Sequence, residues 1–179
     1  MELSHDELAH NLALHLMRPN RMVWENLPCG SIGSQRPDVL VMNKSYSKTN
    51  PVAYKVKVSV SDFRSDVTSA KLRGYLNFAW GVTFAVPKGL ITKKDLPNGC
   101  GLITYNGQGW STVKLPTLSP CPLDTEFMLK LLIDGAQKQT RPDPPKLREF
   151  ENYRSHEALR KNGAKTSPIK SHLSVNILR

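Results

Sequence analysis

The stretches RPDVLVMN (residues 36–43) and VAYKVKVSV (residues 52–60) decide the fold of this chain. In the second stretch, apolar residues alternate with lysine, serine and alanine, which is the two-residue repeat of a strand with one apolar face. The first stretch is almost entirely apolar after Asp38, as is typical of a strand near the middle of a sheet. A polar loop joins the two stretches, so we expect neighbouring strands over residues 38–43 and 52–60.

Further helices and strands are expected on both sides of this pair. Ser4 and Glu7 form a capping-box pattern at the start of a predicted helix. Asn106 and Gly107 favour a turn between two short strands. The expected elements are helices over residues 4–16, 61–79 and 123–136, and additional strands over residues 21–29, 80–86, 101–105 and 110–115. This order predicts an α/β fold with a central mixed β-sheet flanked by helices.

The character of the chain changes after Gln137. Pro142, Pro144 and Pro145 cannot continue a helix, and the residues beyond them are polar with clustered charges. We interpret residues 1–137 as one folded domain and residues 138–179 as a proline-containing linker followed by a basic C-terminal tail.

The composition is strongly basic, with 25 lysines and arginines against 15 acidic residues and a formal net charge of +10. A protein of this charge commonly meets an anionic partner such as nucleic acid. Three widely spaced cysteines without a CxxC pair indicate reduced thiols and a cytoplasmic location. No apolar run approaches the roughly 18 residues of a membrane span, so no membrane association is expected.

The strand pair also places groups that suit phosphodiester chemistry. Asp38 opens one expected strand, and Lys55 and Lys57 lie on the polar face of the next. In many nucleases a carboxylate pair at this place holds a divalent cation, which polarises the scissile phosphate and acidifies a water. A lysine on the same face orients the nucleophile and offsets the charge of the phosphoryl group.

Four sequence blocks together resemble the MmcB-like branch of the PD-(D/E)xK nuclease superfamily. The blocks are RPDVLVMN (36–43), AYKVKVSVSDFRSD (53–66), FAVPKGLI (84–91) and LPNGCGLI (96–103). The resemblance begins at the first helix, reaches at least Ile103 and stops before the tail. It implies a restriction-endonuclease-like core, hydrolysis of DNA phosphodiester bonds with Mg²⁺ or Mn²⁺, and a place in DNA repair or phage nucleic-acid processing.

Residue by residue, the resemblance makes Asp38 a metal ligand and Lys57 the catalytic lysine, with Glu25 as a supporting metal ligand. The residues expected to contact DNA are Arg36, Arg64, Lys71, Arg73 and Tyr75. The acid of the (D/E)xK motif belongs at position 55, where this chain has Lys55. An ammonium group there repels a divalent cation and can pair with Asp38 instead, so we expect weakened metal binding and impaired cleavage. We favour an engineered or selected inactivation over a naturally inactive member, because the other motif elements are present.

Other interpretations of these residues stay open at this stage. Asp38 also suits a strand-opening turn, and the two lysines suit a solvated strand face. Asp62 and Asp66 are typical charges at a helix N-terminus. The hypotheses are therefore an impaired metal-dependent deoxyribonuclease, a catalytically inactive DNA-binding protein on the same scaffold, and a protein-interaction role for the tail. A homodimer is also compatible with the sequence.

Overall fold

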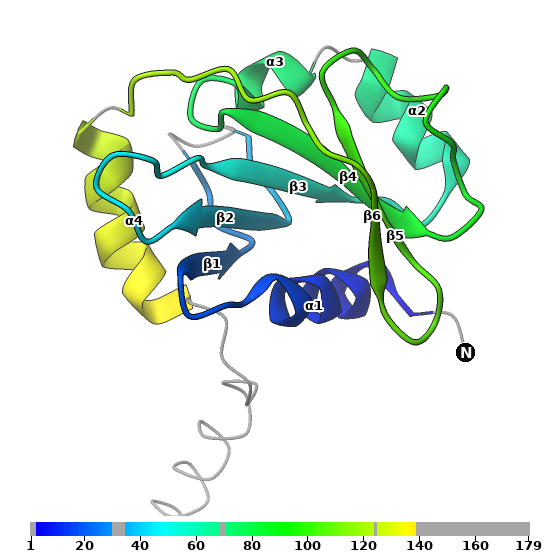
Figure 1. The fold of residues 1–179 in the computed structure, drawn as a ribbon, viewed down its shortest axis with the longest axis horizontal. Helices are drawn as coiled ribbons and strands as arrows, with labels where there is room; N and C mark the ends of the chain where they lie inside the picture. Colours follow the sequence, from blue (N-terminus) through cyan, green and yellow to red (C-terminus); the bar gives the residue numbers. More distant parts are fainter. Residues whose placement is uncertain (1–2, 30–34, 69–70, 124, 139–179) are drawn as a thin grey trace, which may run out of the picture. The chain divides into compact units, whose positions relative to one another are not determined.

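A computed structural model describes residues 3–29, 35–68, 71–123 and 125–138 of the chain. Within these residues a six-stranded mixed sheet is flanked by helices on both faces (Figure 1). The strands are β1 (Arg21–Glu25), β2 (Val39–Asn43), β3 (Val52–Val56), β4 (Gly81–Pro87), β5 (Gly101–Tyr105) and β6 (Trp110–Lys114). The helices are α1 (His5–Leu16), α2 (Val60–Thr68), α3 (Lys71–Tyr75) and α4 (Thr125–Lys138). The predicted α/β class with a central mixed sheet is therefore confirmed.

The strands lie in the sheet in the order of the chain, but their directions differ. Strand β2 is antiparallel to both β1 and β3, the strands β3, β4 and β5 are parallel to one another, and β6 is antiparallel to β5. Helices α2 and α3 supply the crossover that the parallel pair of β3 and β4 requires. As a result, β3, β4 and β5 all end at the same edge of the sheet.

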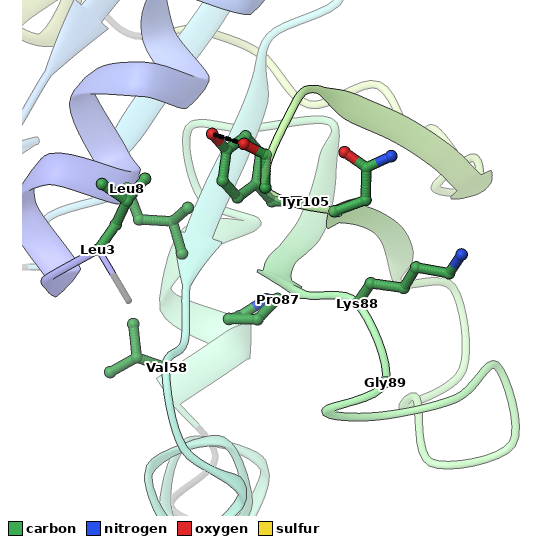
Figure 2. A pocket seen from close by; sticks show the side chains of 9 residues that line it. Leu3, Leu8, Val58, Pro87, Lys88, Gly89 and Tyr105 are labelled. Atoms are coloured by element: carbon green, nitrogen blue, oxygen red, sulfur yellow. Dashed lines mark hydrogen bonds between the residues drawn. The ribbon is translucent and has the colours of Figure 1, made fainter. Parts of the chain in front are cut away.

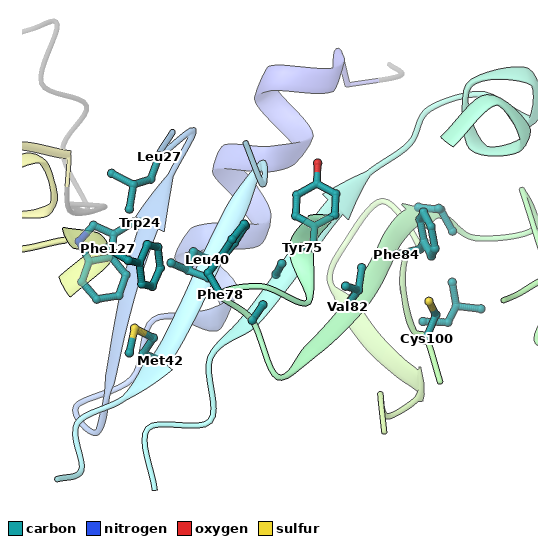
Figure 3. Packing of buried hydrophobic residues seen from close by; sticks show 14 of the residues in the cluster. Trp24, Leu27, Leu40, Met42, Tyr75, Phe78, Val82, Phe84, Cys100 and Phe127 are labelled. Atoms are coloured by element: carbon teal, nitrogen blue, oxygen red, sulfur yellow. The ribbon is translucent and has the colours of Figure 1, made fainter. Parts of the chain in front are cut away.

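Two apolar cores lie on the two faces of the sheet. One core packs α1 against it, and its members include Leu12 and Val56. The other core joins the opposite face to the remaining helices and includes Phe63 of α2, Tyr75 of α3 and Phe127 of α4 (Figure 3). Because strand side chains alternate, Val56 belongs to the α1 core whereas its neighbour Lys55 faces the other helices.

Local sequence signals account for the start of α1 and the end of β1. The Ser4 hydroxyl accepts a hydrogen bond from the backbone N–H of Glu7, and the Glu7 carboxylate accepts one from the backbone N–H of Ser4 at 2.8 Å. The predicted capping box is thus present. Asn26 has a φ of 50°, a left-handed conformation that Asn tolerates, and β1 ends just before it. The strand is therefore shorter than the predicted residues 21–29.

The predicted strand over residues 52–60 is also too long. The strand β3 ends at Val56, and α2 begins at Val60. The Ser59 hydroxyl accepts a hydrogen bond from the backbone N–H of Asp62 at 3.2 Å, so the chain turns into a helix while the valine alternation still continues.

The remaining boundaries are close to the expected ones. The expected helix over residues 61–79 consists of two helices, α2 and α3, because α3 ends at Tyr75. The linker and tail predicted over residues 138–179 lie outside the described residues, apart from Lys138. Within the described residues, no helix is long and apolar enough to cross a membrane.

Candidate functional site

Asp38 and Lys55 form an ion pair at the junction of β2 and β3. Lys55 Nζ lies 3.0 Å from Asp38 Oδ1, and both side chains are largely buried, with 12% and 8% exposed. The backbone N–H of Val56 donates to Asp38 Oδ2 at 2.7 Å. The sequence prediction that the strand pair brings Asp38 beside the polar face of β3 is therefore confirmed. Both carboxylate oxygens already have a protein donor.

The surroundings of Asp38 favour its charged form. Burial opposes ionisation, but His5, Lys55 and the backbone N–H of Val56 outweigh burial and lower the pKa of this carboxyl. His5 lies at the start of α1, with its Nε2 atom 3.7 Å from Asp38 Oδ2. The sequence reading missed His5, because its link to Asp38 depends on how α1 packs against the sheet.

Lys57 is held by two acidic residues of α2. Its ammonium lies 2.9 Å from Asp62 Oδ1 and 2.8 Å from Asp66 Oδ2, and only 6% of its side chain is exposed. Burial lowers the pKa of Lys57, but Asp66 and Asp62 overcome this effect and raise it. The aspartates that the sequence suggested as helix-terminal charges thus neutralise the candidate catalytic lysine.

These residues form what we call the charged cluster: His5, Asp38, Lys55, Lys57, Asp62 and Asp66. The hydrogen bond to Asp38 raises the pKa of His5 to about 9. Burial of the imidazole acts in the opposite direction, and Asp6 adds to the increase. With His5 protonated, the cluster holds three cations and three carboxylates, and Asp6, an exposed residue 3.0 Å from His5 Nδ1, adds a further carboxylate at its margin. Repulsion between Lys55 and Lys57 is reduced because each lysine has its own acidic partner.

Glu25 does not join the charged cluster. Its carboxylate is 3.1 Å from His10 Nδ1, a residue of α1, so the side chain faces α1. Asp38 also contacts α1, but at His5, more than one helical turn before His10. The expectation that Glu25 and Asp38 share a cation is thus not supported by this geometry.

The residues expected to contact DNA have different environments. Arg36, Arg64 and Arg73 are exposed. Tyr75 is buried, and its hydroxyl donates to the backbone oxygen of Arg36 at 3.3 Å. Lys55 Nζ lies 5.8 Å from the centre of the Tyr75 ring, and burial raises the pKa of the phenol. The buried position of Tyr75 does not favour the expected contact with DNA, because its ring packs in the core beneath Lys55.

Of Lys71, the remaining residue expected to contact DNA, only the backbone is described, as the first residue of α3. Its predicted contact with DNA therefore stays a prediction.

The donor set at Asp38 does not fit a divalent cation. A resident Mg²⁺ or Mn²⁺ needs oxygen ligands with free lone pairs directed at one point. Here Asp38 accepts from Lys55 and Val56, and the nearest ammonium repels a cation. Among the described residues, no group of three His, Cys, Asp or Glu side chains is arranged to hold a metal ion.

Comparisons with known proteins bear on the fold. No protein-family model matches the chain, and no curated protein matches it. A solved structure, the SPO1766 protein of unknown function from Silicibacter pomeroyi, is similar with a TM-score of 0.56 and 19% identity, over 96% of this chain and 100% of that one. At this identity the similarity shows the α/β fold alone.

Proposed function

We propose that this chain binds the DNA backbone on a scaffold of the PD-(D/E)xK nuclease type, and that Lys55 leaves its metal-dependent cleavage impaired. The observation that carries the proposal is the 3.0 Å ion pair between Lys55 and Asp38. In the motif that the sequence resembles, an acid stands at position 55 and helps to hold a cation. In this chain the ammonium group of Lys55 supplies the positive charge beside Asp38.

DNA binding is supported by the charge of the chain and by the exposed arginines. The formal net charge is +10, and Arg36, Arg64 and Arg73 are exposed on the segments before β2, in α2 and in α3. These segments also contribute to the charged cluster or contact Lys55. Arginine suits this role because its planar guanidinium pairs with phosphate oxygens.

The first experiment measures affinity for a DNA duplex as a function of salt, without added metal. Because phosphate contacts release counterions, the affinity should fall steeply, with a log–log slope of about −0.9 for each contact. Replacing Arg64 and Arg73 by alanine should reduce that slope by about 2 units. Absence of duplex binding at low salt would show that the proposal is wrong.

The second experiment tests the role of Lys55 with the variant Lys55→Glu. This variant should be stabilised against thermal unfolding by Mn²⁺, and it should gain Mn²⁺-dependent cleavage of duplex DNA, whereas the wild type should do neither. The matched control is Lys48→Glu, which makes the same charge change at an exposed position in the loop before β3. If Lys55→Glu gains neither metal binding nor cleavage, the nuclease ancestry of the site loses its support, and a DNA-binding module remains.

A further inference from the structure

A cavity of about 620 Å³ opens where the parallel strands end. Its walls come from the start of α1 and from the segments that follow β3, β4 and β5 (Figure 2). Ligand sites in open α/β sheets are preferentially found at this edge, outside the carboxyl ends of the strands.

The interior of the cavity suits a flat, weakly polar group. Leu3, Leu8, Val58 and Pro87 present apolar side chains to one region (Figure 2). The Tyr105 hydroxyl donates to the backbone oxygen of Gly107 at 3.0 Å, which fixes the orientation of the aromatic ring before any ligand binds. The ring also packs against Trp110, with the two ring centres 5.1 Å apart. Pockets that take up an extruded base hold it between aromatic and apolar side chains.

The rim of the cavity suits the phosphates that flank a base. Lys88 is exposed, and Figure 2 shows its amino group pointing away from Leu3, Leu8 and Val58. A cation at this place lies outside the apolar region, where the backbone of a bound strand would continue.

The cavity adjoins the charged cluster at two places. Val58 follows Lys57 directly; the Lys57 ammonium pairs with Asp66 of α2, whereas Val58 lines the cavity. His5, which contacts Asp38, lies between the two α1-side lining residues Leu3 and Leu8 in the sequence.

We propose that this cavity takes up one unstacked nucleobase of a single DNA strand. This inference rests on the proposed function. It adds to the proposed DNA binding a preference for single-stranded or frayed DNA. Bases in an intact duplex are stacked and cannot enter a side pocket without being extruded. The cavity therefore adds affinity only for a strand whose bases are free.

The test compares the wild type on a short oligothymidylate and on a fully abasic oligonucleotide of the same length, at one salt concentration. Both ligands carry the same phosphates, so a difference in affinity reports the bases. We expect about tenfold tighter binding of the base-bearing strand, in line with the stacking of one base. This comparison needs no substitution, so it does not depend on a variant that folds.

The variant Val58→Trp then tests whether the difference in affinity between the two oligonucleotides arises in the cavity. Val58 is 40% exposed, and a tryptophan there fills the cavity, so the tenfold difference should disappear while duplex affinity is unchanged. The control Leu118→Trp adds the same side chain at a residue that is 41% exposed. Leu118 lies against Gly81, the first residue of β4, whereas Val58 lies beside its last residue, Pro87. The control should therefore keep the full difference.

The outcomes separate this inference from the proposed function. Equal affinity of the wild type for both oligonucleotides, with duplex binding intact, would overturn the base pocket and leave the proposed function in place. An equal loss of duplex and single-strand binding in Val58→Trp would also overturn it. Failure to bind any of the DNA ligands would remove the proposed function itself.

Discussion

Replacing Lys57 by methionine tests whether the candidate catalytic lysine also holds the fold together. Methionine keeps much of the length and the apolar stem of lysine but carries no charge. In the wild type the ammonium joins α2 to the end of β3 through Asp66 at 2.8 Å and Asp62 at 2.9 Å. The substitution therefore removes the cation from two carboxylates at once.

The expected loss follows from the exposure of each partner. Asp62 is 45% exposed, so water replaces most of its interaction, and that pair contributes less than about 1 kcal/mol. The side chain of Asp66 is only 11% exposed. Removing one partner of a buried ion pair costs about 3–5 kcal/mol, because the remaining carboxylate stays buried without a counter-ion. We expect the free energy of unfolding to fall by about 3 kcal/mol, the lower end, because Asp66 has other interactions as well.

Urea unfolding followed by circular dichroism measures this loss. The control Lys93→Met removes an exposed lysine and should change the free energy of unfolding by less than about 0.5 kcal/mol. The double variant Lys57→Met/Asp66→Asn should be no less stable than Lys57→Met alone, because the neutral amide needs no counter-ion. A loss below about 1 kcal/mol for Lys57→Met would refute the reasoning, since Lys57 would then behave as a surface residue.

Two further predictions concern the start of α1 and the interior of β4. The pKa of His5 is raised from 6.5 to about 9, so protonated His5 stabilises the folded state fully below about pH 6.5, and this contribution is lost as pH rises through about 9. In His5→Gln the difference in melting temperature from the wild type should therefore shrink over that window, and because the side chain is 37% exposed the effect should stay below about 1 kcal/mol. Thr83 is 3% exposed, and its hydroxyl has no hydrogen-bond partner within the described part of the chain. Thr83→Val should raise the free energy of unfolding by about 1 kcal/mol in urea, and a destabilised variant would show that the hydroxyl is satisfied.

The fold was predictable where one local signal decides an element. The capping box of Ser4 and Glu7 starts α1, and the apolar run after Asp38 forms β2. The predicted boundary was wrong where a strand pattern and a helix-capping pattern overlap. The valine alternation continues through Val60, but the cap supplied by Ser59 starts α2 there, and capping prevailed over the strand pattern. Periodicity alone does not show which of two compatible patterns the tertiary contacts will select.

The candidate site was predictable only for contacts within the sheet. The pairing of Asp38 with Lys55 follows from adjacent antiparallel strands, and residue spacing was enough to expect it. The positions of His5 and Asp66 depend on how α1 and α2 pack on the sheet, which the spacing does not contain. Glu25 was misplaced for a related reason: its strand neighbour is β2, but its side chain faces α1. The spacing of residues in the sequence predicted which strands are neighbours, but not which face of the sheet each side chain occupies.

A largely buried lysine at position 55 is compatible with a stable fold because its ammonium pairs with Asp38. In the motif that the sequence resembles, two carboxylates approach each other here and depend on a cation to offset their repulsion. Lys55 replaces that dependence with an internal counter-ion, and burial of both groups strengthens the pair relative to one in water. The pair balances the charge of Asp38 from within the protein. In the proposed function this lysine impairs cleavage, while the exposed side chains of Arg64 and Arg73 are the ones proposed to contact DNA.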